Sequence, residues 1–119
     1  MIDLSNDIEN KLKEISTLES RVFFCYPSSF IKLPCISYYE ITNKGNSYAD
    51  DEEYDSEIEF QIDVWAKNKA EMSSLAIEVD TKMKELGFSR TFASDAFEEA
   101  SANQVIFHKS MRYSQIVEL

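Results

Sequence analysis

The chain is poor in several residue types, and each shortage excludes a class of function. Its only glycines are Gly45 and Gly87, so a glycine-rich phosphate-binding loop is ruled out. Two cysteines and one histidine are too few for a typical zinc site. No apolar run approaches the length of a membrane span, and the opening residues MIDLSNDIENK do not have the pattern of a signal peptide. We therefore expect no metal, no cofactor and no membrane attachment.

Positive charge is also scarce, because 12 Lys and Arg face 22 Asp and Glu, which gives a formal net charge of -10. A duplex-binding domain normally carries a basic patch, and none is visible, so DNA should be repelled rather than bound. Aromatic residues make up 13% of the 119 residues, which predicts one folded domain rather than a disordered chain. Cys25 and Cys35 lie in apolar surroundings, as free buried thiols do.

Hydrophobic periodicity predicts two helices, over about residues 2–18 and 68–86. Asn68 and Glu71 have the spacing of a capping pair, and Gly87 should end the second helix. Strands are expected at 21–26, 35–43, 54–67, 88–94 and 104–118, with a turn in NKGNS and an acidic connection in DAFEEAS. The order α-β-β-β-α-β-β predicts an α+β fold, in which two amphipathic helices pack on one face of a mostly antiparallel sheet that contains a long β-hairpin.

The densest run of acids lies in the stretch YADDEEYDSEIEFQIDVWAK, residues 48–67. From Tyr54 onward apolar and polar residues alternate, which predicts a strand with one buried and one wet face, paired antiparallel with residues 35–43. The run lacks the central Gly and ligand spacing of an EF-hand, so no specific cation site is predicted. The acids assigned to a solvent-facing or channel-facing surface are Asp50, Asp51, Glu52, Glu53, Asp55, Glu57 and Glu59.

Trp65 falls on the wet side of this alternation, beside Asp63 and Lys67. Two interpretations are open: a neighbouring loop or the N-terminus covers it, or it lies in a subunit interface, where aromatic residues are enriched. Tyr38 and Tyr39 place aromatic side chains on both faces of the facing strand, so Tyr38, Tyr39 and Trp65 are candidate interface anchors. The single histidine, His108, is expected at a surface or interface, and no catalytic constellation is evident around it.

Several segments together resemble a known family. They are PCISYYEI, the strand YADDEEYDSEIEFQIDVWAK, the helix that follows it, LGFSRTFASDAFEEA and FHKSMRYS, and they span about residues 22–113. The combination resembles the small tail-completion proteins of long-tailed phages, prophages and phage-tail-like particles, which include tail terminators and tail-to-head joining proteins. The resemblance implies an α+β subunit of a hexameric ring on the head-proximal end of the tail tube, with no catalytic residue and no cofactor.

The resemblance also implies a set of partners. These would be further copies of the chain, the tail tube protein, and a neck or head-completion protein, in a virion tail assembled in the host cytoplasm. DNA would pass through the ring without being bound, and the acidic row would repel it from the lumen. Two alternatives stay open: a neighbouring neck adaptor, and an acidic DNA mimic that inhibits a nucleic-acid-binding enzyme. A small enzyme is a third class that no constellation of residues supports.

Overall fold

A computed structural model describes residues 1–27, 32–101 and 104–118. It is an α+β structure with two helices and a five-stranded, mostly antiparallel sheet. The sheet order is β1-β2-β3-β5-β4, and β1 runs parallel to β2 while the other neighbours are antiparallel. The elements in chain order are α1 (Ser5–Leu12), the 3-10 turn η1 (Ser16–Leu18), β1 (Val22–Phe24), β2 (Cys35–Ala49), β3 (Glu52–Ala66), α2 (Lys69–Glu85), β4 (Ser89–Ser101) and β5 (Gln104–Glu118).

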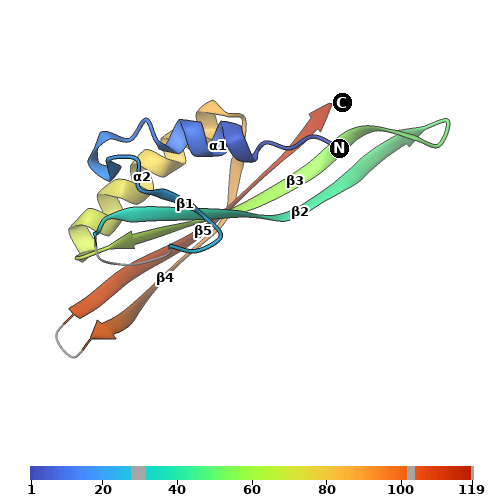
Figure 1. Cartoon of the computed structure of the whole chain (residues 1–119). Helices are drawn as coiled ribbons and strands as arrows, with labels where there is room; N and C mark the ends of the chain where they lie inside the picture. Colours follow the sequence, from blue (N-terminus) through green and yellow to red (C-terminus); the bar gives the residue numbers. More distant parts are fainter. Residues whose placement is uncertain (28–31, 102–103, 119) are drawn as a thin grey trace.

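Both helices lie on the same side of the sheet (Figure 1). The even-numbered residues of β3 from Ile58 to Ala66 are buried in one core with apolar residues of both helices. Successive side chains of a strand point to opposite faces, so the odd-numbered residues of β3 point away from the helices. This confirms the predicted burial of the even positions from Ile58 to Ala66. The prediction is wrong at Tyr54, which is exposed, and at the odd positions Asp55, Asp63 and Trp65, which are buried rather than wet. The core residues contributed by the helices are Ile8, Leu12, Met72, Leu75, Ala76, Val79 and Met83.

The helix ends follow local backbone chemistry. The Asn68 side chain accepts a hydrogen bond from the backbone N–H of Glu71 at 2.8 Å, so the predicted cap of α2 is confirmed. Gly87 follows α2 with a φ of 89°, a left-handed conformation that glycine adopts without strain. The first helix is shorter than predicted, because Ile15 adopts an extended backbone and the chain continues as the separate turn η1.

Both hairpins are longer than the sequence predicts. The expected turn NKGNS is part of β2, and the reversal instead occurs at Asp50 and Asp51, whose φ values are 52° and 65°. Two consecutive positive φ angles are typical of the tight turns that join antiparallel strands, and Asp tolerates this conformation better than most residues. Register shifts beside Gly45 let β2 continue to pair with β3 through the segment expected to turn. The expected connection DAFEEAS likewise belongs to β4 and pairs with β5.

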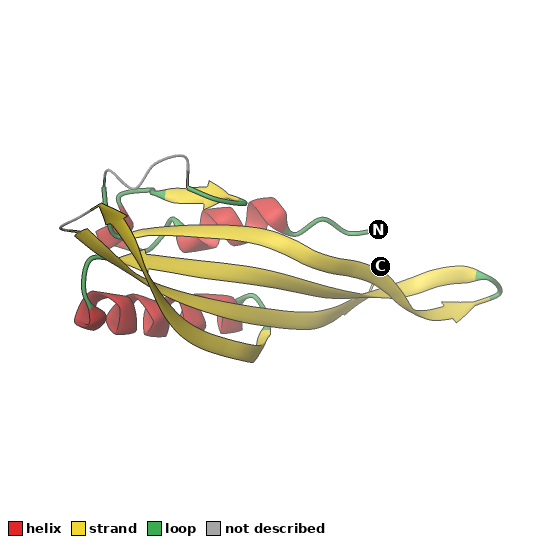
Figure 2. Ribbon diagram, turned by 90° about the horizontal axis from the view of Figure 1, so that it is seen from below, coloured by secondary structure: helices red, strands yellow, loops and turns green. Residues whose placement is uncertain are grey.

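The molecule is elongated, with extents of 59 × 24 × 22 Å. The β2–β3 hairpin and the β4–β5 hairpin point to opposite ends of the molecule (Figures 1 and 2). The outer part of the β2–β3 hairpin, residues 44–57, extends beyond both helices and is called the arm below.

Candidate interaction surfaces

The face of the sheet opposite the helices, called the far face, carries a polar cluster on β3 and β5. The register pairs Asp63 with Ser110 and Trp65 with His108, which brings their side chains to this one face. Asp63 Oδ1 lies 2.8 Å from His108 Nε2 and accepts a hydrogen bond from Ser110 Oγ at 2.7 Å. Gln61 Nε2 lies 3.2 Å from each carboxylate oxygen. Asp63 is thus a buried acid within hydrogen-bond distance of three polar side chains, those of Gln61, His108 and Ser110.

These contacts set the charge of Asp63. Burial alone would raise the pKa of the Asp63 carboxyl, but hydrogen bonds from His108, Ser110 and Gln61 outweigh burial and hold the pKa below its ordinary value. Such a carboxylate is a weak base. Asp63 Oδ1 and Ser110 Oγ also approach the same ring nitrogen of His108, at 2.8 and 3.2 Å. A catalytic relay needs the acid and the hydroxyl on opposite ring nitrogens, so this cluster is not arranged for nucleophilic catalysis.

Trp65 is not a surface residue. Only 2% of it is exposed, and its ring stacks on His108 with centroids 3.8 Å apart and planes 11° apart. Its Nε1 donates to Ser37 Oγ at 3.0 Å, and Tyr26 packs edge-on against it at 5.3 Å. Of the two interpretations of Trp65, cover by a neighbouring segment is confirmed, since Tyr26 packs on its ring. The position of Trp65 on the far side of β3 is as predicted, but this side is not wet there. A second, smaller core lies here, formed by Cys35, Trp65 and Ile106 with Phe23 and Leu33 packed against it.

The two tyrosines of the interface prediction have different environments. Tyr38 is 4% exposed and lies on the helix side, where its hydroxyl donates to Glu9 Oε1 at 3.1 Å. Burial, with Glu9 nearby, raises the pKa of Tyr38 to about 12. Tyr38 and Trp65 are both buried within the single chain, which removes them as exposed anchors, whereas Tyr39 is half-buried on the far face.

Other aromatic side chains, which the sequence did not indicate as interface candidates, are exposed. Tyr48 and Tyr54 are 62% and 50% exposed and flank the turn of the arm. Their position in a strongly acidic stretch was the one sign in the sequence that these tyrosines would be exposed. Phe92 and Phe97 on β4 are also exposed. The sequence does not reveal this, because it predicts a strand only over residues 88–94 and a connection after it.

The acids of the arm do not all lie at the surface. Asp50, Asp51 and Glu52, called the acidic tip below, are exposed, and Glu53, Glu57 and Glu59 are partly exposed. Asp55 is buried, because its Oδ1 accepts a hydrogen bond from the backbone N–H of Ser47 at 2.7 Å, so its assignment to an open surface is wrong. The one Lys of the arm, Lys44, pairs with Glu57 at 3.6 Å.

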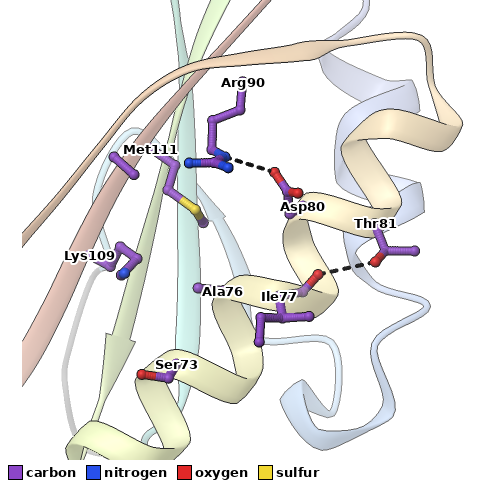
Figure 3. Close-up of a pocket in the computed structure, with 9 residues that line it drawn as sticks. Ser73, Ala76, Ile77, Asp80, Thr81, Arg90, Lys109 and Met111 are labelled. Carbon is purple, nitrogen blue, oxygen red and sulfur yellow. Dashed lines mark hydrogen bonds and ion pairs between the residues drawn. The ribbon is translucent and has the colours of Figure 1, made fainter.

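A groove of about 330 Å³ lies between α2 and the strands β4 and β5 (Figure 3). Ala76 and Ile77 of the helix and Met111 of β5 give it an apolar lining, and Arg90 and Lys109 lie on its strand side. Asp80 holds the groove together, because its Oδ1 accepts from Arg90 Nε at 3.1 Å and from the Tyr113 hydroxyl at 2.9 Å.

The chain matches no family profile, and no curated protein matches it significantly. Within the described residues, no helix is both long and apolar enough to cross a membrane. The same part of the chain holds no group of three or more His, Cys, Asp or Glu placed to bind a metal ion. The resemblance to tail-completion proteins therefore stays a prediction from the sequence.

Proposed function

We propose that the chain is a structural subunit of a phage-type tail, most specifically a tail terminator that caps the head-proximal end of the tail tube and joins it to the neck or head. The observation that carries this proposal is the projecting arm. It extends beyond the body of an elongated subunit and presents exposed Tyr48 and Tyr54 beside an acidic tip. Aromatic residues are enriched at protein interfaces, so an arm of this kind suits assembly with neighbours.

The subunits form a hexameric ring through contacts between two different surface patches, which close when the rotation between neighbours is right. Because Trp65 and Tyr38 are buried, the anchors of these contacts are the exposed tyrosines of the arm, with Tyr39 as a lesser contributor. One end of the ring meets the tail tube protein and the other meets a neck or head-completion protein. The location is the virion tail, assembled in the host cytoplasm.

Deleting the gene and imaging the particles tests the role. Overlong tails without heads are expected, because a tube that lacks its terminator continues to polymerise. Tails of normal length that fail to join heads would move the protein to a neck adaptor. Intact, functional particles would refute both roles.

The partly exposed acids Glu57 and Glu59 lie on the far face and, in this proposal, help to line the channel. A negative lumen repels the phosphates of passing DNA. A Glu57→Lys/Glu59→Lys variant should keep normal tail length but deliver DNA more slowly, as measured by adsorption-to-release kinetics. The matched control changes two exposed acids of the helix side, Asp7→Lys/Glu78→Lys, and should deliver DNA at the normal rate. Equal infectivity of the two variants would refute the hypothesis that Glu57 and Glu59 line the channel.

The net charge of -10 and the exposed acidic tip favour a second candidate, an acidic DNA mimic that inhibits a nucleic-acid-binding enzyme. Mimicry requires surface carboxylates only, and it gives no role to the exposed tyrosines of the arm, so it is the weaker candidate. Tight binding to a host nuclease or restriction enzyme in a pull-down, with no association with tails, would decide in its favour.

A further inference from the structure

The strand β4 is a long, open edge of the sheet. It is the last strand in the sheet order, and every side chain from Ser89 to Phe97 is exposed. Open edges are normally short, or protected by Lys, Pro or a covering segment, because their unpaired backbone groups invite another chain. This strand contains neither Lys nor Pro and carries Phe92 and Phe97 in exposed positions. Between the register shifts at its two ends it pairs with β5 without interruption from Phe92 to Glu99. It is therefore a surface that a partner can extend.

Cations flank this edge on both faces of the sheet. Arg90 is about half exposed, and in the described part of the chain its Nε alone is engaged, by Asp80. Arg112 is exposed on the far face, with its guanidinium 5.1 Å over the Phe92 ring and its Nε donating to Gln61 Oε1 at 3.3 Å. Lys109 faces the groove, paired with Asp95 at 3.0 Å. Arg90 and Lys109 are thus paired with acids of the same chain, and β4 itself carries Asp95, Glu98 and Glu99. The positive groups that this edge can offer to an acidic partner are therefore Arg112 and the free part of the Arg90 guanidinium, both near the start of β4.

The acidic tip of the arm has the complementary chemistry. Asp50, Asp51 and Glu52 are exposed there, between Tyr48 and Tyr54. The arm and the β4–β5 hairpin point to opposite ends of the subunit, so the tip does not meet β4 of its own chain (Figure 1). The acidic tip and the tyrosines of the arm can therefore reach the cations and phenylalanines of β4 only in another copy of the chain.

We propose that the arm of one copy lies along the free edge of β4 of a second copy, with its acidic tip against Arg90 and Arg112 and its tyrosines at the groove between β4 and α2. Strand addition to an open edge next to a helix-lined groove is a known mode of recognition, in which backbone hydrogen bonds give affinity and the groove gives specificity. The inference rests on the proposed ring, since it names the two patches whose contact would close it.

Paramagnetic relaxation measures this contact even when it is weak. A nitroxide on Ala49→Cys, in a Cys25→Ser background, is mixed at millimolar concentration with ¹⁵N-labelled protein that carries no nitroxide. The expected result is selective broadening of the backbone amides of residues 89–97. The amides of β1, at the opposite edge of the sheet, are the internal reference and should stay sharp. Broadening centred elsewhere, or none, would overturn the proposal.

Charge reversal provides the second test. Arg90→Glu/Arg112→Glu and, separately, Asp51→Arg/Glu52→Arg should each weaken self-association about tenfold or more in sedimentation, and mixing the two variants should restore it. The control Lys13→Glu/Lys32→Glu makes the same charge change away from β4 and should associate like the parent. Failure of the mixture to recover association would refute the pairing. If the gene deletion gives overlong tails but the mixed variants do not associate, the terminator role is supported and only the contact between the arm and β4 is refuted.

Discussion

A Trp65→Ala variant is expected to lose about 3–5 kcal/mol of unfolding free energy, measured by urea denaturation, as large aromatic side chains removed from cores generally do. The change would open a cavity in the smaller core of the far face, where Trp65 packs with Cys35 and Ile106. It would also remove the ring that stacks on His108 and leave Ser37 Oγ, in a fully buried residue, without its indole donor. Each of these effects lies within one subunit, so the loss should be independent of protein concentration.

Tyr48→Ala is the matched control, because it also removes an aromatic side chain from the β2–β3 hairpin but from an exposed position. Its effect on stability should stay within about 0.5 kcal/mol. A Trp65→Ala variant that is as stable as the parent yet fails to assemble would restore the interpretation of Trp65 as an interface residue.

The second large effect concerns Asp63. Replacing it by Asn should cost about 1–3 kcal/mol at neutral pH, because His108 and Ser110 then face an amide in place of a carboxylate that accepts both of their hydrogen bonds. The control is the exposed acid Asp95, which pairs with the partly buried Lys109, and Asp95→Asn should cost less than about 1 kcal/mol.

The same residue predicts an acid dependence. The pKa of Asp63 in the folded state lies below its ordinary value, so its stabilisation is present above the unfolded-state pKa and is lost as the pH falls through the folded-state pKa. The unfolding free energy of the parent should therefore decrease below about pH 4, and the gap between parent and Asp63→Asn should narrow there. A gap that stays constant from pH 7 to pH 3 would show that the charge of Asp63 contributes nothing.

Much of the fold can be predicted from local sequence patterns. The burial of the even positions of β3 from Ile58 onward, the Asn68 cap and the Gly87 stop each depend on residues close in sequence, and the structure shows all three. The turn at Asp50 and Asp51 was missed because Gly45 carries the stronger turn signal, yet strand pairing with β3 continues past it. Pairing energy along two strands outweighed the local preference of one glycine.

The surfaces were harder to predict than the elements. The position of Trp65 on the far side of β3 follows from parity, but its burial depends on Tyr26, Cys35 and Ile106, which belong to distant parts of the chain. Tyr38 is buried for a similar reason, since α1 brings Glu9 to its hydroxyl. The open edge of β4 exists only because β5, rather than β4, pairs with β3, which no local pattern reveals.

The arm has a consequence for how the chain can change over time. Along β3 the half near Ala66 is fixed by two cores, whereas the tip around Asp50 contacts neither core. Substitutions of exposed side chains near the tip, outside the turn residues Asp50 and Asp51 whose φ angles are positive, should therefore have little effect on the stability of the folded state. Under the proposed contact between two copies, recognition can change at one end of a single strand while the other end holds the architecture constant. Related chains should then diverge most in the arm and in the β4 surface proposed to receive it.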